Sequence, residues 1–241
     1  MKFYRNVYPH ELNVEILTVI YIHIGKTAGE SIENYLKDMF HNNVINLVEL
    51  HVYNSNEIIK SFLEIKSEKL IYLVSTRDPI ERWVSSYNWD KYVYMYKEPH
   101  ERLSKLHACV KNADHLVSFL SSSNNNEEIL AKEIHNSGHT CMGQSWYLPF
   151  DVVHKLPKNK TYVIDFKNIK SDLDKFIEKL NLKIKNKDAI LQISKHDYKF
   201  EIKNSENIFS TKLSKNNLDF LKEYLEFDFK IHDILLNNFN K

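Results

Sequence analysis

Four stretches of the chain consist almost entirely of apolar and β-branched residues, and each is long enough to form one strand. They span residues 15–24, 44–50, 69–75 and 161–166. The first of them, EILTVIYIHI, is apolar almost without interruption. Runs of this kind predict strands that are buried on both faces of a parallel sheet, because a half-exposed strand would alternate apolar and polar residues.

Helical spacing fills the intervals between these runs. Apolar residues recur three or four positions apart over residues 31–40 and 55–65, and residues 78–89 open with a helix-start signal. In that signal Asp78 is the expected N-cap and Pro79 the first helical residue. Strands and helices therefore alternate over this first part of the chain. This order indicates the α/β fold class, with a central parallel sheet flanked by helices.

The pattern of apolar residues is less regular between residues 92 and 150. Residues 101–120 have a helical period, residues 121–128 form a polar loop, and residues 135–150 show no clear period. We expect helices and an irregular segment over residues 92–150, lying over the active site. After the last strand, Ser171 and Ser214 are the predicted N-caps of two amphipathic helices, the second of which closes the chain. No linker or repeat divides the sequence, so residues 1–241 are predicted to form one domain.

The composition indicates which kinds of partner and which cellular compartment fit the protein. The formal net charge is +1, from 33 basic and 32 acidic residues, so no global field attracts nucleic acid or a membrane surface. Two cysteines do not make a disulfide framework, and a reducing compartment fits. No stretch reaches the roughly 18 apolar residues of a membrane-spanning helix, and residues 1–13 lack the features of a signal peptide. We therefore expect a soluble, cytoplasmic protein. The oligomeric state is not indicated.

The first apolar run ends at a loop suited to an anion. A strand that leads through a turn into a helix leaves the first N–H groups of the helix unpaired and directed at a ligand. Gly25 and Gly29 allow close approach, Lys26 supplies a charge, and Thr27 and Ser31 supply hydroxyls. The loop of nucleotide triphosphatases needs a further glycine at position 20. That position is isoleucine, so a P-loop kinase is the less favoured alternative.

Two motifs resemble those of carbohydrate sulfotransferases of the heparan type. Residues 23–32, HIGKTAGESI, are similar to the family's 5′-phosphosulfate loop, H-I-x-K-T-[AG]-G-[TS]-S. Residues 70–89 are similar to its 3′-phosphate motif, a strand followed by R-D-P-x-E-R-x-x-S-x-Y. The matching positions are Arg77, Asp78, Pro79, Glu81, Arg82, Ser85 and Tyr87. The late strand and the closing segment also resemble the family, so the resemblance covers most of the chain outside residues 92–150.

The resemblance implies a P-loop-like phosphosulfate site and an activity. The donor would be 3′-phosphoadenosine-5′-phosphosulfate (PAPS), the product adenosine 3′,5′-bisphosphate, and the acceptor a hydroxyl on a carbohydrate, with no metal required. Lys26 would stabilise the leaving group, and Arg77 with Ser85 would hold the 3′-phosphate. The donor loop would consist of Gly25, Lys26, Thr27, Ala28, Gly29, Glu30 and Ser31. Glu30 departs from the family pattern, which has a small hydroxyl residue there. Its carboxylate either stabilises the N-terminus of the helix, where acidic residues are favoured, or faces a cationic group of the acceptor.

The general base is expected at the carboxyl ends of the strands, where ligands bind in open α/β sheets. His51 directly follows the second predicted strand, in a segment that also resembles the family's histidine-containing turn, and histidine has a suitable intrinsic pKa. Glu49, two residues earlier on the same strand face, is the alternative base. His196 is a competing histidine, whereas His23 lies within the first strand and is interpreted as a core residue.

Two other groups of residues in the segment 135–147 have a pattern that could indicate a ligand. His135, His139 and Cys141 have metal-like spacing but lack a fourth ligand, so they are interpreted as incidental residues of a polar loop. Trp146 and Tyr147 are possible platforms for a sugar ring. Besides the kinase, a non-catalytic nucleotide-binding module stays open as a second alternative to the sulfotransferase.

Overall fold

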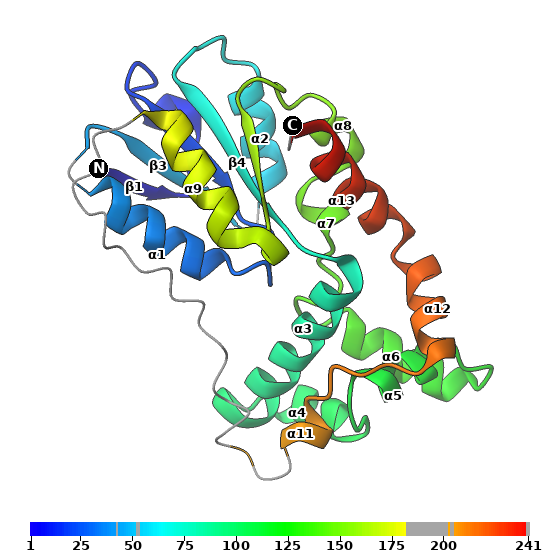
Figure 1. Ribbon diagram of the computed structural model, residues 1–241. Helices are drawn as coiled ribbons and strands as arrows, with labels where there is room; N and C mark the ends of the chain where they lie inside the picture. Colours follow the sequence, from blue (N-terminus) through cyan, green and yellow to red (C-terminus); the bar gives the residue numbers. More distant parts are fainter. Residues whose placement is uncertain (42, 52–53, 182–201, 203–204, 240–241) are drawn as a thin grey trace. The chain divides into compact units, whose positions relative to one another are not determined.

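The computed structural model describes residues 1–41, 43–51, 54–181, 202 and 205–239. Its centre is a five-stranded sheet in which every neighbouring pair of strands is parallel. The strand order is β1-β3-β2-β4-β5, and the strands are β1 Lys2–Arg5, β2 Thr18–Ile22, β3 Asn46–Leu50, β4 Leu70–Thr76 and β5 Thr161–Asp165. The predicted α/β class with a parallel sheet flanked by helices is confirmed (Figure 1).

The four predicted strands correspond to β2, β3, β4 and β5, each close to its predicted bounds. β2 lies at the centre, with Thr18 in register with Asn46 of β3 and Leu70 of β4. All five residues of β2 are buried, which explains the continuous apolar run. The edge strand β1 was not predicted. It is short and lies in a segment without an apolar run.

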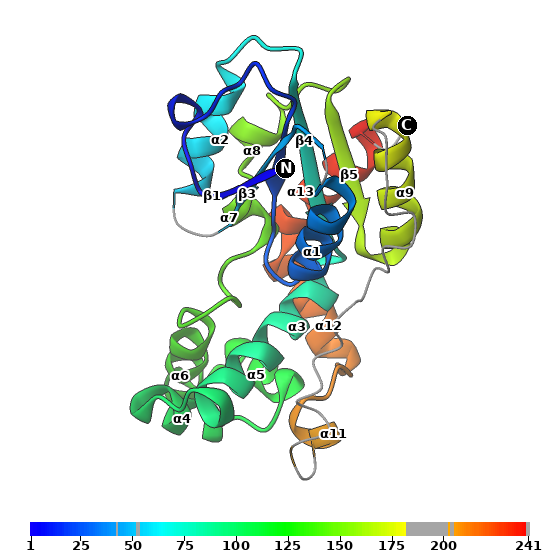
Figure 2. The ribbon, with the colours of Figure 1, turned by 90° about the vertical axis from the view of Figure 1, so that its left-hand side faces the viewer.

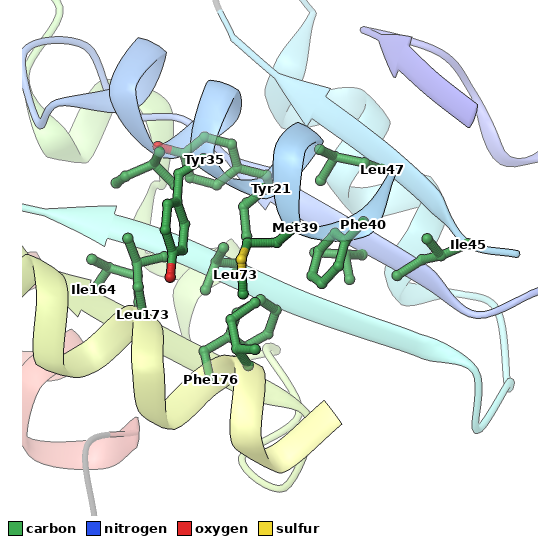
Figure 3. Packing of buried hydrophobic residues seen from close by; sticks show 14 of the residues in the cluster. Tyr21, Tyr35, Met39, Phe40, Ile45, Leu47, Leu73, Ile164, Leu173 and Phe176 are labelled. Atoms are coloured by element: carbon green, nitrogen blue, oxygen red, sulfur yellow. The ribbon is translucent and has the colours of Figure 1, made fainter. Parts of the chain in front are cut away.

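One face of the sheet is covered by α1 (Gly29–Phe40) and α9 (Ile169–Leu180). Figure 3 shows side chains from both helices gathered against those of the strands, with Tyr35 and Phe40 from α1, Leu173 and Phe176 from α9, and Leu73 from β4. These side chains are almost fully buried. Burial of such large apolar groups stabilises the sheet at roughly 25 cal/mol per Å² removed from water.

The other face carries α2 (Ser55–Leu63) and α8 (Phe150–Val153), with the four-residue α7 (Gln144–Tyr147) next to them (Figures 1 and 2). α1 connects β2 to β3 on one side, and α2 then crosses to β4 on the other side of β2. The chain therefore reverses its direction across the sheet at β2. The carboxyl ends of β2, β3 and β4 meet at this switch point, where open α/β sheets bind ligands.

Contacts between residues divide the chain into two compact units. The first comprises Met1–Arg77, Gln144–Ser194 and Lys230–Lys241, and it contains the whole sheet. The second comprises Asp78–Gly143 and Lys195–Phe229. Its described helices are α3 Pro79–Tyr92, α4 Glu101–Ala108, α5 Ala113–Leu120, α6 Asn125–His135, α11 Ser205–Ile208 and α12 Lys215–Tyr224. All of these helices except α11 contribute to a core of their own around Trp83, Tyr87 and Leu116. That residues 1–241 act as one domain stays a prediction.

The remaining short helices are η1 Pro9–Glu11, the π-helix η2 Val93–Lys97 and η3 Phe166–Asn168, and α13 (Glu226–Phe239) ends the described chain. None of the helices in the described ranges combines the length and the apolar character needed to cross a membrane.

Four helix predictions need correction. Asn168, not Ser171, occupies the N-cap position of α9, and the Ser171 hydroxyl donates to the Asn168 carbonyl from inside the helix. The predicted helix 101–120 is two helices, because Asn112 caps α5. The predicted loop 121–128 contains the start of α6, capped by Asn124. Ser214 caps α12 as predicted, but the closing segment is two helices that separate at Leu225.

Candidate active site

The loop between β2 and α1 has an unusual backbone. Lys26 and Ala28 have positive φ values of 67° and 65°, whereas no described glycine does. A non-glycine residue in this region costs roughly 1–3 kcal/mol, and such strain clusters at ligand sites. Left-handed residues alternating with others turn successive N–H groups toward one concave side, which binds anions. Ala28 is also the N-cap of α1, so the positive end of that helix lies at the same place.

The two glycines of the loop are needed for space. A Cβ at Gly25 would lie 2.7 Å from the hydroxyl oxygen of Tyr147, and one at Gly29 would collide with the imidazole ring of His23. The loop is thus closely packed against α7 on one side and against the residues after β2 on the other. This packing holds the strained backbone in one conformation.

The hydroxyl of Thr27 lies inside the protein. It donates to the carbonyl of Ile24 over 2.6 Å and lies 2.6 Å from the hydroxyl of Ser75, which accepts from Tyr21 over 3.0 Å. The Thr27 side chain therefore shapes the loop from within, and its N–H is the group suited to an anion. Ser31 is also buried, whereas Glu30 is exposed in the first turn of α1. An acid there is favoured by the helix dipole.

Arg77 follows the last residue of β4 and lies against the loop. Its Nη1 donates to the carbonyl of Lys26 over 3.4 Å, and its guanidinium lies 4.1 Å above the ring of Phe166. The side-chain amide of Gln144 donates to the Arg77 carbonyl over 2.8 Å. The two sequence motifs therefore meet at the carboxyl edge of the sheet, because β2 and β4 are neighbours.

The second motif continues into the other compact unit. Asp78 is the N-cap of α3 as predicted, and its carboxylate accepts from the N–H groups of Ile80 and Glu81. Ser85 is half-buried on the same helix, and Arg82 is fully buried and donates to Ser86. That Ser85 joins Arg77 at one phosphate stays a prediction.

His51 lies at the carboxyl edge, directly after β3. Asn6 fixes its main chain from both sides, since the amide of Asn6 donates to the His51 carbonyl (2.8 Å) and accepts from the His51 N–H (2.9 Å). The ring Nδ1 lies 2.9 Å from the carbonyl oxygen of His23. A carbonyl only accepts, so we assign the proton to Nδ1 and, in the neutral ring, the lone pair to Nε2. This tautomer suits a general base.

Glu49 is much less suited to that task. Its carboxylate is buried between Arg5, whose Nε lies 2.5 Å away, and His23, whose Nδ1 lies 2.6 Å away. Burial alone would raise the pKa of Glu49, but the hydrogen bond and charge interaction with His23, together with hydrogen bonds to Glu33 and Arg5, lower it to about 2. A carboxylate this acidic is a weak acceptor of a proton at neutral pH. The geometry thus favours His51.

A family model described as the sulfotransferase family matches residues 16–233. The chain belongs to the sulfotransferase family. No curated protein and no solved structure matches the chain. The family supports sulfuryl transfer as the type of reaction.

Several other residues of this sulfotransferase were singled out by sequence. Tyr147 is 1% exposed and Trp146 37% exposed, so of these two rings that of Trp146 is the accessible one. Cys141 donates to the Gly138 carbonyl, and His139 lies 2.8 Å from Asp90. His135 stacks on Trp83, and within the described ranges no group of three or more His, Cys, Asp or Glu residues could hold a metal ion. His196 lies outside the described residues.

Sequence reasoning missed three residues that support the site of the sulfotransferase. They are Asn6, which fixes the main chain of His51; Gln144, which binds the main chain of Arg77; and His23, which was interpreted as a core residue. The first two act on main-chain groups far away in sequence, which leaves no local pattern. For His23 a signal existed, because a histidine directly before the loop, and Glu49 on the neighbouring strand, are both polar residues within apolar runs.

Proposed function

We propose that this sulfotransferase moves the sulfuryl group of PAPS to a hydroxyl of a carbohydrate, with Lys26 stabilising the leaving group and His51 acting as general base. The observation that carries the proposal is the meeting of three elements at one sheet edge. They are the strained loop at the N-terminus of α1, the Arg77 guanidinium bonded to that loop, and the ring of His51 after β3.

The residues present fit the donor. A phosphosulfate needs several N–H donors and a cation at short range, which the loop 25–31 and Lys26 supply. A second phosphate needs a bidentate cation a few ångströms away, and a guanidinium meets that need better than an ammonium. Arg77 is positioned for it by its stacking on Phe166 and by the bond from Gln144 to its carbonyl. With the 3′-phosphate on Arg77, PAPS is favoured over donors that lack one.

The donor supplies an activated sulfuryl group, and the residues of the chain do the rest. The acceptor oxygen forms a bond to sulfur as the bond between sulfur and the phosphate oxygen breaks. The hydroxyl proton passes to Nε2 of His51, the nitrogen that carries the lone pair in the assigned tautomer. Negative charge grows on the departing phosphate, where Lys26 and the N-terminus of α1 stabilise it. This division of tasks needs no metal ion.

The acceptor class rests on the resemblance to carbohydrate sulfotransferases and on Trp146, whose partly exposed ring can stack on a sugar. A cytoplasmic location is part of the same proposal and rests on the sequence alone. A P-loop kinase is disfavoured by Ile20, and a non-catalytic module gives no reason for the fixed tautomer of His51.

The test combines binding and transfer. In a thermal-shift comparison, adenosine 3′,5′-bisphosphate should stabilise the protein and ATP with Mg²⁺ should not. Radiolabelled PAPS should then label a member of a panel of glycans, phenols and alcohols, and labelling should continue in EDTA. If ATP with Mg²⁺ stabilised the protein and the bisphosphate did not, the result would support the kinase. If the bisphosphate bound but no acceptor became labelled, the result would support the non-catalytic module.

A further inference from the structure

A buried carboxylate connects three strands beside the loop. Oε1 of Glu49, on β3, lies 2.6 Å from Nδ1 of His23, which follows β2, and Oε2 accepts from Arg5, the last residue of β1. The Glu49 side chain is 2% exposed, and that of Arg5 58%. Glu33 and Lys37 of α1 continue the network beyond Arg5. Arg5 and His23 thus each bind one oxygen of the Glu49 carboxylate, and the His23 side chain is the partner that is better shielded from water.

The ring of His23 lies directly against that of His51. Their centroids are 4.0 Å apart and their planes differ by 15°. Tyr21 stacks on His23 at 5.6 Å, and Tyr147 stacks on His51 at 5.7 Å. Burial raises the pKa of Tyr21, so it stays neutral. In the described part of the chain His23 and Tyr147 stack on His51, and of these two rings that of His23 is the one that can acquire a positive charge near neutral pH.

Two imidazolium rings at this distance repel each other strongly. At 4 Å the energy between two unit charges near a protein surface corresponds to roughly three pH units, and partial exposure reduces this to about one. The two rings therefore titrate as a coupled pair, in which a proton bound to one ring makes protonation of the other less favourable. A carboxylate bonded to one ring decides which of them is charged.

We propose that His23 and Glu49 are a positioning pair that keeps His51 neutral. Glu49 holds the positive charge on His23, and the charged ring of His23, stacked on His51, delays protonation of His51 as the pH falls. The carbonyl of His23 also fixes the tautomer in which Nε2 of His51 carries the lone pair. The general base of the proposed function thus remains in its active form at a lower pH than a lone histidine would. The expected effect on activity rests on the proposed function, whereas the coupling of the two rings does not.

The decisive experiment on activity is the pH–rate profile at saturating PAPS. In Glu49→Gln, the amide still accepts from His23 Nδ1 but no longer favours its charged form. The acid limb of the profile should move to higher pH by about one unit, while the plateau at high pH keeps most of kcat. His23→Gln should move the limb in the same direction. The matched control is Asp38→Asn, which removes one negative charge from an exposed residue of α1 outside this network, and its limb should stay in place.

A second measurement requires neither activity nor a stable variant. NMR titration of the histidine rings in the wild-type protein should show His23 gaining its proton before His51, in two steps separated by about one pH unit or more. The reverse order would overturn the proposal, as would unmoved or downward-shifted acid limbs in both variants. A uniform loss of kcat at every pH would indicate a merely structural pair and would overturn it too. If His51→Ala kept its activity, the proposed function would fail, whereas the NMR titration would still decide the coupling of the two rings.

Discussion

The guanidinium of Arg77 donates a hydrogen bond to the main-chain oxygen of Lys26 over 3.4 Å. The two residues are far apart in sequence and belong to different motifs, yet parallel pairing of β2 and β4 brings both to one edge of the sheet. The two cationic residues of the proposed donor site therefore lie at one place in the fold. Distinct losses are expected when each cation is removed.

Lys26→Ala should lower kcat by roughly 10²-fold or more, because the residue acts on charge that develops in the transition state. Donor affinity should fall as well, since the same ammonium lies in the anion-binding loop. Single-turnover transfer from PAPS separates the two effects. Lys175→Ala, which removes an exposed lysine of α9, is the control and should leave both quantities unchanged. Wild-type kcat in Lys26→Ala would remove Lys26 from the mechanism.

Arg77→Ala should act on affinity and selectivity. Loss of charged hydrogen bonds to a phosphate corresponds to roughly a 10- to 100-fold weaker affinity for adenosine 3′,5′-bisphosphate. Affinity for the nucleotide without the 3′-phosphate should hardly change. Calorimetric titration with the two nucleotides measures the ratio directly. An unchanged preference for the 3′-phosphorylated nucleotide in Arg77→Ala would show that another residue holds that phosphate.

Gly29→Ala tests the packing between the loop and His23. A Cβ at this position collides with the imidazole ring, and overpacking of this kind typically costs about 1–3 kcal/mol in the free energy of unfolding. In a His23→Ala background the same change should cost almost nothing, because the ring is gone and Gly29 needs no positive φ. Denaturant unfolding of the four proteins closes this cycle. Equal costs in both backgrounds would show that the contact is not the reason for the glycine.

The second unit carries a pH dependence of its own. His107 is fully buried among Tyr87 and Tyr94, and burial lowers its pKa to about 4. An unfolded histidine binds its proton near pH 6.5, so between about pH 6.5 and 4 the unfolded state takes up a proton that the folded state does not.

Folding stability should therefore fall in that window as the pH is lowered, by about 1.4 kcal/mol per pH unit for this histidine. Burial also lowers the pKa of His135 in the same unit to about 4, so His107→Phe should remove only part of the dependence, whereas the same change at the exposed His41 should remove none. Denaturant midpoints at several pH values provide the measurement. A wild-type midpoint that stays constant from pH 6.5 to 4 would contradict the assignment.

Features that depend on residues close together in the sequence could be predicted from it. The continuous apolar run of β2, the loop that follows it and the Asp78–Pro79 start of α3 are local signals, and the structure has them where expected. The strand β1 could not be predicted, because four residues at a sheet edge carry no period. The break at Leu225 occurs without glycine or proline, so no local signal separates α12 from α13.

The residues of the candidate site show the same difference between local signals and contacts from distant segments. Lys26, Arg77 and His51 were found because each lies at the end of a recognisable strand. The partners that set their chemistry were not, because the contacts depend on the pairing of distant segments. Arg5 reaches Glu49 only through the pairing of β1 with β3, and the carbonyl of His23 fixes the tautomer of His51 only because β2 lies beside β3. Residue type alone made Glu49 a plausible base, and its burial between Arg5 and His23 made it a poor one.

The central claim is that His51 takes the acceptor proton during sulfuryl transfer. The most direct test is transfer of radiolabelled sulfate from PAPS by the wild-type protein and by His51→Ala, with adenosine 3′,5′-bisphosphate affinity measured on both. We predict unchanged affinity and a kcat lower by roughly 10²- to 10⁴-fold in the variant, the range for loss of a general base. A His51→Ala protein that binds the bisphosphate and transfers sulfate at close to the wild-type rate would contradict it.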